Sequence, residues 1–192
     1  MTKTKQGLLI VISGPSGAGK GTVLSSLLKG CEDTVISVSA TTRKPREGEK
    51  NGQNYYFLSR EEFEELIRSD GILEYAEYCG NLYGTPRRHV EERLQMGINV
   101  ILEIEVQGAA QVVEKCKGAV TIFLMPPSLA ELEARLRGRG TEAEEVIQKR
   151  VAAAQQELLA APNYDYIIIN DEVEKAAAEI NALITAEKQK LH

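Results

Sequence analysis

The chain has 192 residues, a length that favours one domain with small insertions. Hydrophobic residues make up 43% of it, enough to form a buried core, so the composition excludes a disordered chain. The formal net charge of -5 argues against partners that select a basic surface, such as nucleic acids and anionic membranes. Only His89 and His192 are histidines, which argues against a His-ligated metal site or a Ser-His-Asp hydrolase.

Cysteine usage and hydropathy predict the compartment. Cys31, Cys79 and Cys116 are widely spaced and form no CxxC pair, so reduced thiols are the simplest interpretation. No apolar stretch approaches the roughly 20 residues of a membrane span. The apolar run after the N-terminal MTKTKQ is too short for a secretory signal. We therefore expect a cytoplasmic protein that does not bind membranes.

Short apolar runs rich in β-branched residues predict five buried strands of a mainly parallel sheet. The runs cover residues 8–13, 34–39, 99–105, 119–125 and 164–170. Helices are expected between and after them, including 19–29, 86–96 and 172–190, with capping boxes at Ser128–Glu131 and Thr141–Glu144. Alternating strands and helices predict a three-layer α/β domain with right-handed crossovers.

Residues 40–85 interrupt this alternation. Turn signals at Lys44-Pro45 and Asn51-Gly52 mark a polar loop, and the short strand YYFLS follows. The segment SREEFEELIRS predicts a helix with a capping box at Ser59–Glu62. The alternating segment ILEYAEYCGNLYG contains a turn at Cys79-Gly80-Asn81 and predicts a hairpin. We expect a small α+β insertion on the main sheet.

The segment GPSGAGKGT follows the first predicted strand and precedes a predicted helix. Small residues let backbone N–H groups approach an anion, the helix N-terminus adds partial positive charge, and Lys20 supplies a full one. Gly14 to Lys20 therefore fits a nucleotide-phosphate loop better than a glycine-rich turn with a surface lysine. Gly21 stands where Ser or Thr is usual, so the metal would be held through water, by Thr22 or by a carboxylate elsewhere. This disfavours a GTPase switch and leaves a kinase open.

Two basic clusters flank this loop. Arg43, Lys44 and Arg46 form the first, within the insertion. Arg135, Arg137 and Arg139 form the second, with Arg150 in the helix beyond it. A solvated charged surface is the usual explanation of such clusters. In an acidic chain with a phosphate loop, however, two clusters suit two phosphorylated ligands, one gripping an acceptor and one closing over the transferred group.

The chain resembles the guanylate kinase family of P-loop nucleoside monophosphate kinases. The resemblance is carried, in order, by GPSGAGKGT, SVSATTRKPREGEKNGQNYYFLS, LEYAEYCGNLYGTP, ILEIEVQGA, LRGRGTEAEEVIQKR and YDYIIIND. It implies ATP-dependent phosphorylation of GMP, and of dGMP, to the diphosphate by direct in-line transfer in purine nucleotide metabolism, with Mg²⁺ arriving as MgATP. It implies a P-loop NTPase-type core (1–39, 86–134 and 151–192), a GMP-binding region over 40–85 and a helical lid at about 135–150. It leaves the oligomeric state open.

The resemblance also implies which residues form the site. The ATP-binding residues would be Gly14, Pro15, Ser16, Gly17, Ala18, Gly19, Lys20, Gly21, Thr22 and Asn170. Those holding the GMP phosphate would be Arg43, Arg46, Tyr55 and Tyr83, and those reading the guanine would be Ser39, Glu74, Thr85 and Glu105. The catalytic residues would be Lys20, Arg43, Arg135, Arg139 and Arg150. The family usually has aspartate at one or both of the positions of Glu103 and Glu105, and we assign Glu103 to the metal, through water, with Thr22 as a second candidate.

The chemistry of the base supports Glu74 as the guanine reader. Guanine presents N1–H and the N2 amino group side by side, and one carboxylate accepts from both, whereas adenine places a lone pair there. Three alternatives remain at this stage. They are a kinase for another nucleoside monophosphate, a non-catalytic protein-interaction module of guanylate-kinase type, and a nucleotide-dependent switch.

Overall fold

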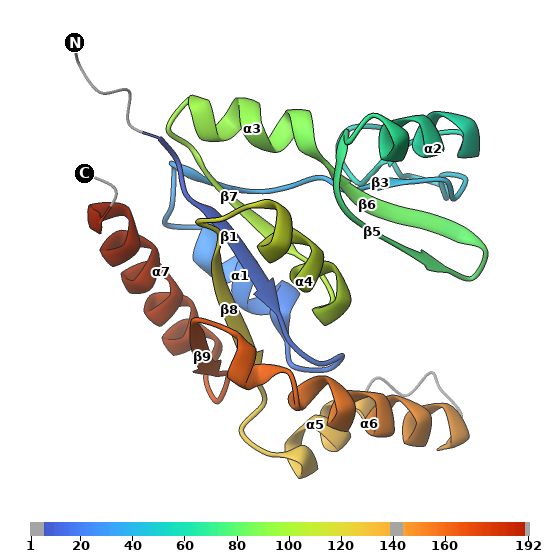
Figure 1. Cartoon of the computed structure of the whole chain (residues 1–192). Coiled ribbons are helices and arrows are strands. Elements are labelled where there is room, and N and C mark those ends of the chain that lie inside the picture. The colour runs from blue at the N-terminus through green and yellow to red at the C-terminus, as the bar shows by residue number, and fades with distance from the viewer. Residues whose placement is uncertain (1–5, 139–143, 191–192) are drawn as a thin grey trace.

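The computed structural model describes residues 6–138 and 144–190. Its main sheet has five parallel strands in the order β2-β7-β1-β8-β9 (Figure 1). They are β1 (Leu9–Ser13), β2 (Thr34–Ile36), β7 (Asn99–Glu103), β8 (Val120–Met125) and β9 (Tyr166–Ile169). Each strand lies inside its predicted apolar run, so the predicted α/β class and five-stranded parallel sheet are confirmed.

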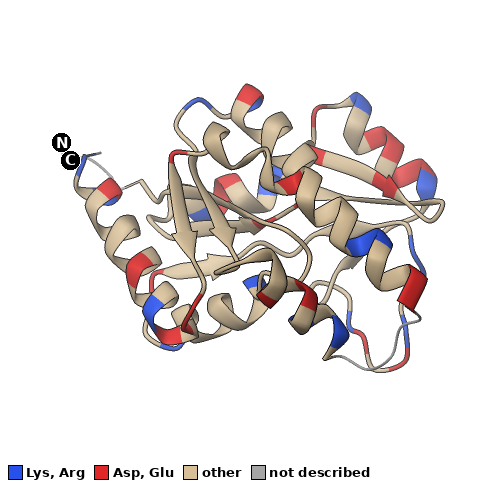
Figure 2. Ribbon diagram, turned by 90° about the horizontal axis from the view of Figure 1, so that it is seen from below, with Lys and Arg blue, Asp and Glu red and all other residues tan. Residues whose placement is uncertain are grey.

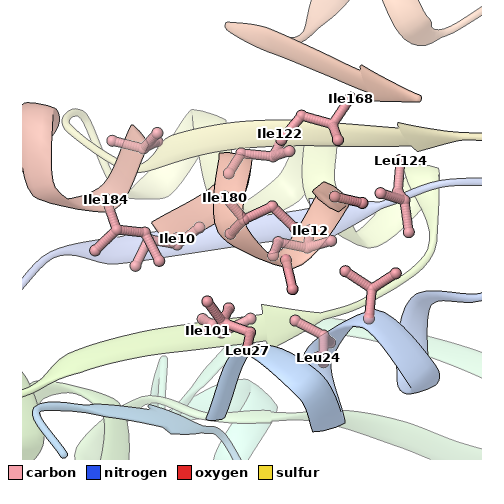
Figure 3. Close-up of a cluster of buried hydrophobic side chains, with 14 of the residues drawn as sticks. Ile10, Ile12, Leu24, Leu27, Ile101, Ile122, Leu124, Ile168, Ile180 and Ile184 are labelled. Atoms are coloured by element: carbon pink, nitrogen blue, oxygen red, sulfur yellow. The ribbon is translucent and has the colours of Figure 1, made fainter. Parts of the chain in front are cut away.

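Helices cover both faces of this sheet because successive strand residues point to opposite sides. On one face, α1 (Lys20–Leu28) and α7 (Val173–Lys190) close over the isoleucines of the central strands (Figure 3). On the other face, α3 (Arg87–Gln95) and α4 (Val106–Lys115) pack Val90 and Val112 against Leu9 and Val11. The result is the predicted three-layer core, with β1 buried on both sides.

A second, mixed sheet is formed within residues 40–86. It contains β3 (Ala40–Thr41), β4 (Tyr56–Phe57), β5 (Ile72–Tyr78) and β6 (Asn81–Pro86) in the order β4-β3-β6-β5. Helix α2 (Arg60–Arg68) buries Phe63 against this sheet and begins at the predicted Ser59–Glu62 capping box. The hairpin turns through Cys79 and Gly80, both with positive φ (49° and 74°), as a two-residue turn requires. The predicted α+β insertion is therefore confirmed.

Two further helices, α5 (Leu129–Arg137) and α6 (Glu144–Leu158), pack together through their own small apolar cluster. Helix α5 begins at Ser128, whose hydroxyl accepts from the Glu131 N–H at 3.1 Å. The predicted cap at Thr141 and the predicted catalytic residue Arg139 lie outside the described residues. A short 3-10 turn (Ala161–Asn163) connects α6 to β9. Pro86 caps α3, whereas the sequence predicted that it would be the first residue of the helix.

Charged residues lie mainly on helices and loops, while the central strands are almost free of them (Figure 2). Among residues 6–138 and 144–190, no helix combines the length and the apolar character needed to cross a membrane. Because all five main strands are parallel, their carboxyl ends meet at one edge of the sheet, where α/β proteins bind ligands. Ser13, Glu103 and Asn170 mark that edge.

Candidate active site

The phosphate loop connects β1 to α1 and depends on three glycines. Gly17 and Gly19 have φ values of 91° and 86°, a left-handed conformation that L side chains rarely adopt. A Cβ on Gly14 would lie 2.2 Å from the Leu124 carbonyl oxygen, and one on Gly19 would lie 2.5 Å from Nδ2 of Asn170. Glycine is therefore required for both conformation and space, and the loop exposes its backbone at the carboxyl edge of the sheet.

Lys20 begins α1 and folds back over this loop. Its Nζ donates to the carbonyl oxygens of Gly14 at 2.5 Å and Pro15 at 3.2 Å. Burial lowers the pKa of the Lys20 ammonium from its ordinary value, because desolvation disfavours the charged form. Three neighbouring carboxylates act in the opposite direction, and they belong to Glu103, Glu157 and Glu105. The ammonium is thus held at the centre of an acidic group of side chains.

Helix α6 reaches the phosphate loop through Ser16. The Ser16 N–H donates to Oε2 of Glu157 at 3.3 Å, and the Arg150 guanidinium donates to the Ser16 hydroxyl at 2.6 Å. Burial raises the pKa of the Glu157 carboxyl, while the Ser16 amide and Lys20 oppose that rise. Arg150 was predicted from the family resemblance, whereas no motif or spacing indicated Glu157.

Arg135 and Asn170 meet at the other side of the loop. The Asn170 Nδ2 donates to the Ala18 carbonyl at 2.7 Å, and Arg135 Nη2 donates to the Asn170 carbonyl at 3.1 Å. The Asn170 Oδ1 is buried and has no hydrogen-bond partner among the described residues. The neighbouring Arg137 instead pairs with Glu133 and Glu144, so its charge joins α5 to α6.

In the first basic cluster, Arg43 follows β3 of the small sheet, and hydrogen bonds hold its guanidinium in place. The Arg43 guanidinium makes two hydrogen bonds to Glu49, at 2.9 and 3.0 Å, and lies 5.5 Å from the Tyr55 ring centroid. Glu49 also accepts from the Arg46 N–H at 2.7 Å. The bidentate pairing raises the pKa of Arg43 and lowers that of Glu49. The rings of Tyr55 and Tyr83 stand edge to face at 6.1 Å beside this pair.

The sequence analysis did not predict Glu49, although its position offers a signal. An acidic residue three positions after Arg46 in a polar loop is a natural partner for the preceding arginines. The bidentate contact restricts the Arg43 side chain before any anion arrives.

Glu74 is the buried carboxylate of the small sheet, with 6% of its surface exposed. Its Oε1 accepts from the Thr85 hydroxyl at 2.6 Å. Burial raises the pKa of Glu74, and the charge of Glu105 adds to that rise. The hydrogen bonds from Thr85 and the charge of Lys115 favour the ionised form. A carboxylate so placed can accept two hydrogen bonds from a ligand that enters the cavity.

One cavity of about 670 Å³ connects the phosphate loop to the Glu74 carboxylate. The predicted site residues that line it are Gly14, Ser16, Lys20, Ser39, Tyr55, Glu74, Tyr83, Glu103 and Glu105. Lining residues that were not predicted include Asn54, Tyr78, Gln107 and Glu157. Predicted residues outside the lining are Arg43, Arg46, Thr85, Arg135, Arg150, Asn170, Thr22 and the rest of the phosphate loop. Of these, Thr85 contacts Glu74, Arg150 contacts Ser16, and Asn170 contacts Ala18.

The phosphate loop lies at the carboxyl edge of a parallel sheet. An insertion that carries arginines and a buried carboxylate lines the same cavity. These features together define the class of P-loop phosphotransferases. Comparison with known proteins narrows this class. The family model described as guanylate kinase matches residues 6–187. The chain belongs to the guanylate kinase family.

Individual guanylate kinases match nearly the full length of this chain. The guanylate kinase of Halalkalibacterium halodurans is 56% identical over 183 residues, covering 95% of this chain and 90% of that protein. The guanylate kinase of Clostridioides difficile is 52% identical, with coverage of 97% and 91%. The crystal structure of guanylate kinase from Anaplasma phagocytophilum superposes with a TM-score of 0.74 at 38% identity, covering 96% of this chain and 87% of that chain. The resemblance inferred from the sequence is confirmed.

Proposed function

We propose that this chain phosphorylates GMP, and dGMP, to the diphosphate by direct in-line transfer of the γ-phosphoryl group of ATP. Membership of the guanylate kinase family gives the reaction. The observation that carries the mechanism is that Lys20, the phosphate-loop residues Gly14 and Ser16, and Glu74 all line one cavity. A donor bound at one end and an acceptor bound at the other would meet with their phosphates between them.

The donor side of the proposed site is built to receive polyphosphate. The loop from Gly14 to Thr22 would bind the ATP phosphates through its backbone N–H groups, and Lys20 would move from its own loop carbonyls to the β- and γ-phosphates. Arg135 and Asn170 lie beside the same loop and would face the nucleotide there. Arg150, already at Ser16, would neutralise charge on the transferred group.

The acceptor side would hold the GMP phosphate with Arg43, Arg46, Tyr55 and Tyr83. A phosphate monoester has a second pKa near 6 and is largely dianionic at neutral pH, so it needs no strong general base. The task of the protein is to bring two anions together and align them. Arg43 is suited to that task because Glu49 fixes its guanidinium in advance.

At the far end of the cavity, Glu74 would select guanine by accepting from N1–H and the N2 amino group. Thr85, Ser39 and Glu105 would complete the base site, with Thr85 orienting the carboxylate through its 2.6 Å hydrogen bond. A buried acceptor left facing a lone pair, as adenine would require, is strongly disfavoured.

The residues at the donor end fit Mg²⁺ that arrives with the nucleotide. Mg²⁺ keeps several waters and is commonly held by one or two carboxylates plus phosphates. Glu103, an exposed carboxylate at the end of β7, and the exposed hydroxyl residue Thr22 are the oxygen ligands we assign to it. Within residues 6–138 and 144–190, no cluster of three or more His, Cys, Asp or Glu residues could hold an ion alone. When bound, the metal would neutralise phosphate charge.

Water must be excluded, because otherwise ATP would be hydrolysed. We propose a division into a core (1–39, 86–134 and 151–192), a GMP-binding region (40–85) and a lid (about 135–150) that closes over the substrates. Leu136 and Ile147 of the proposed lid belong to the apolar cluster that α5 and α6 share, which supports a lid that moves together with these two helices. Arg139 would act from this lid, and it lies outside the described residues.

The substrate assignment is tested by measuring ADP release with GMP, AMP, UMP and CMP in turn. We expect rapid, acceptor-dependent ADP release with GMP and rates lower by at least about 100-fold with AMP, since a buried acceptor rejects the wrong base strongly. Equal rates with all four acceptors, or the same rate with none, would contradict the proposal.

A further inference from the structure

Strand β5 contains a bulge at the guanine-reading carboxylate. Ile72 pairs with Pro86 and Tyr75 pairs with Gly84, so β5 advances three residues where β6 advances two. Bulges redirect side chains out of the regular alternation. Here Leu73 and Glu74 are both buried, Leu73 in the core cluster beneath the main sheet and Glu74 against the substrate cavity. The direction of Glu74 therefore depends on what holds this bulge in place.

Helix α4 packs against β5, and two of its side chains form hydrogen bonds to the main chain on either side of the bulge. The Gln111 Oε1 accepts from the Tyr75 N–H at 3.2 Å, and its Nε2 donates to the Tyr75 carbonyl at 3.0 Å. The Lys115 Nζ donates to the Ile72 carbonyl at 3.1 Å. Gln111 thus pairs with both main-chain hydrogen-bonding groups of Tyr75, as a neighbouring strand would. Lys115 binds the main-chain carbonyl on the other side of the bulge, at Ile72.

Gly108 completes the same helical face, because it precedes Gln111 by three residues and Lys115 by seven. A Cβ on Gly108 would lie 2.6 Å from Oε2 of Glu74 and 3.2 Å from its Cδ, so a side chain there would displace the carboxylate. Gly108 is inside a helix, where glycine is less favourable than alanine. Its φ is not in the left-handed region, so the need for glycine here is one of space.

We propose that Gly108, Gln111 and Lys115 are positioning residues for guanine selection, holding the bulge so that the Glu74 carboxylate faces the base edge. This inference rests on the proposed role of Glu74 as the guanine reader. It assigns specificity to a face of α4, a helix of the core, and not only to the small sheet that carries Glu74.

The test compares GMP with IMP, which keeps N1–H but lacks the N2 amino group. The readout is the ratio of kcat/KM for GMP to kcat/KM for IMP, together with KM for ATP and the melting temperature. For Gly108→Ala we expect the ratio to fall about tenfold, as expected for misplacing one of two hydrogen bonds, with KM for ATP unchanged. Gln111→Ala should lower the ratio in the same direction. Gly30→Ala is the matched control, since a Cβ there meets nothing within 4 Å.

A second arm separates positioning from general loosening of the fold. Glu74→Asp shortens the side chain by one methylene and leaves room for the methyl group added by Gly108→Ala. The double variant should therefore lose less of the GMP/IMP ratio than the product of the two single losses, because the two residues are in contact. Purely multiplicative losses would contradict direct contact between the two side chains.

Glu74→Gln separates the proposed role of Glu74 from the proposed role of the α4 face. If Glu74→Gln leaves the GMP/IMP ratio unchanged, Glu74 does not read guanine, and both its proposed role and this inference fail. If Glu74→Gln lowers the ratio while Gly108→Ala and Gln111→Ala keep the wild-type ratio, the inference alone fails. Should Gly108→Ala be too unstable to assay, as its melting temperature would show, Gln111→Ala decides the matter by the same ratio.

Discussion

Individual residues in this site are held in place before a substrate arrives. Arg43 is fixed by Glu49, Glu74 accepts a hydrogen bond from Thr85, and Lys20 donates to its own loop. Each contact reduces the conformational freedom that binding would otherwise have to remove. Lys20 differs from the other two, because phosphates must replace its present carbonyl acceptors.

The protonation state of Glu74 should control base selection. Burial raises the pKa of this carboxyl above the ordinary value of 4.5, and Glu105 adds to the rise, while Thr85 and Lys115 oppose it. Only the ionised carboxylate accepts from both guanine donors. We therefore expect the GMP/IMP ratio of kcat/KM to fall as the pH drops through the raised pKa, earlier than an exposed glutamate would allow.

The ratio isolates the base edge, because the phosphates of GMP and IMP titrate alike. A ratio that stays constant down to pH 4.5 would contradict this explanation.

The raised pKa of Glu74 also affects the free energy of unfolding, in a direction that can be stated. Since the folded pKa is raised, the fold binds this proton more tightly than the unfolded chain, so the contribution of Glu74 to stability declines as the pH rises through the window between the two pKa values.

At the scale of elements, helix α6 connects the proposed lid to the phosphate loop. Two of its side chains, Arg150 and Glu157, form hydrogen bonds with Ser16. Glu157 places a negative charge at the phosphate loop, where the negatively charged phosphates of ATP would bind. It also interacts with the charge of Lys20. The carboxylate therefore competes with phosphate for the same cation and the same amide.

Removing that charge should favour the nucleotide. We expect Glu157→Gln to lower KM for ATP by roughly 3- to 10-fold, the effect of one partly screened charge, with KM for GMP little changed. The matched control is Glu145→Gln, an exposed carboxylate on the same helix. Steady-state kinetics with ATP varied at saturating GMP measures the effect. An increase in KM for ATP would instead mean that Glu157 holds the loop in its binding conformation.

At the scale of the whole molecule, much of the architecture could be predicted from the sequence because it depends on local signals. Apolar β-branched runs specify buried parallel strands, and GPSGAGKGT specifies a loop between a strand and a helix. The Ser59–Glu62 box and the turn at Cys79 and Gly80 are likewise local. Such features need no knowledge of distant parts of the chain.

The rest of the site depends on distant contacts and could not be predicted in this way. The alternation in ILEYAEY predicts a regular strand, yet a bulge redirects Glu74 because α4 fastens its flanks. Glu157 reaches the phosphate loop from 141 positions away in the sequence. The family resemblance indicated the roles of Glu74 and Arg150, but not the contacts that position them.

In the proposed reaction, donor and acceptor occupy one cavity together and exchange the phosphoryl group directly. The most direct test is binding of a single molecule in which adenosine and guanosine are joined by a chain of phosphates. We predict that one such molecule binds per chain, much more tightly than either ATP or GMP, and that it competes with both. Competition with only one of the two nucleotides, or binding of two molecules per chain, would contradict a shared cavity.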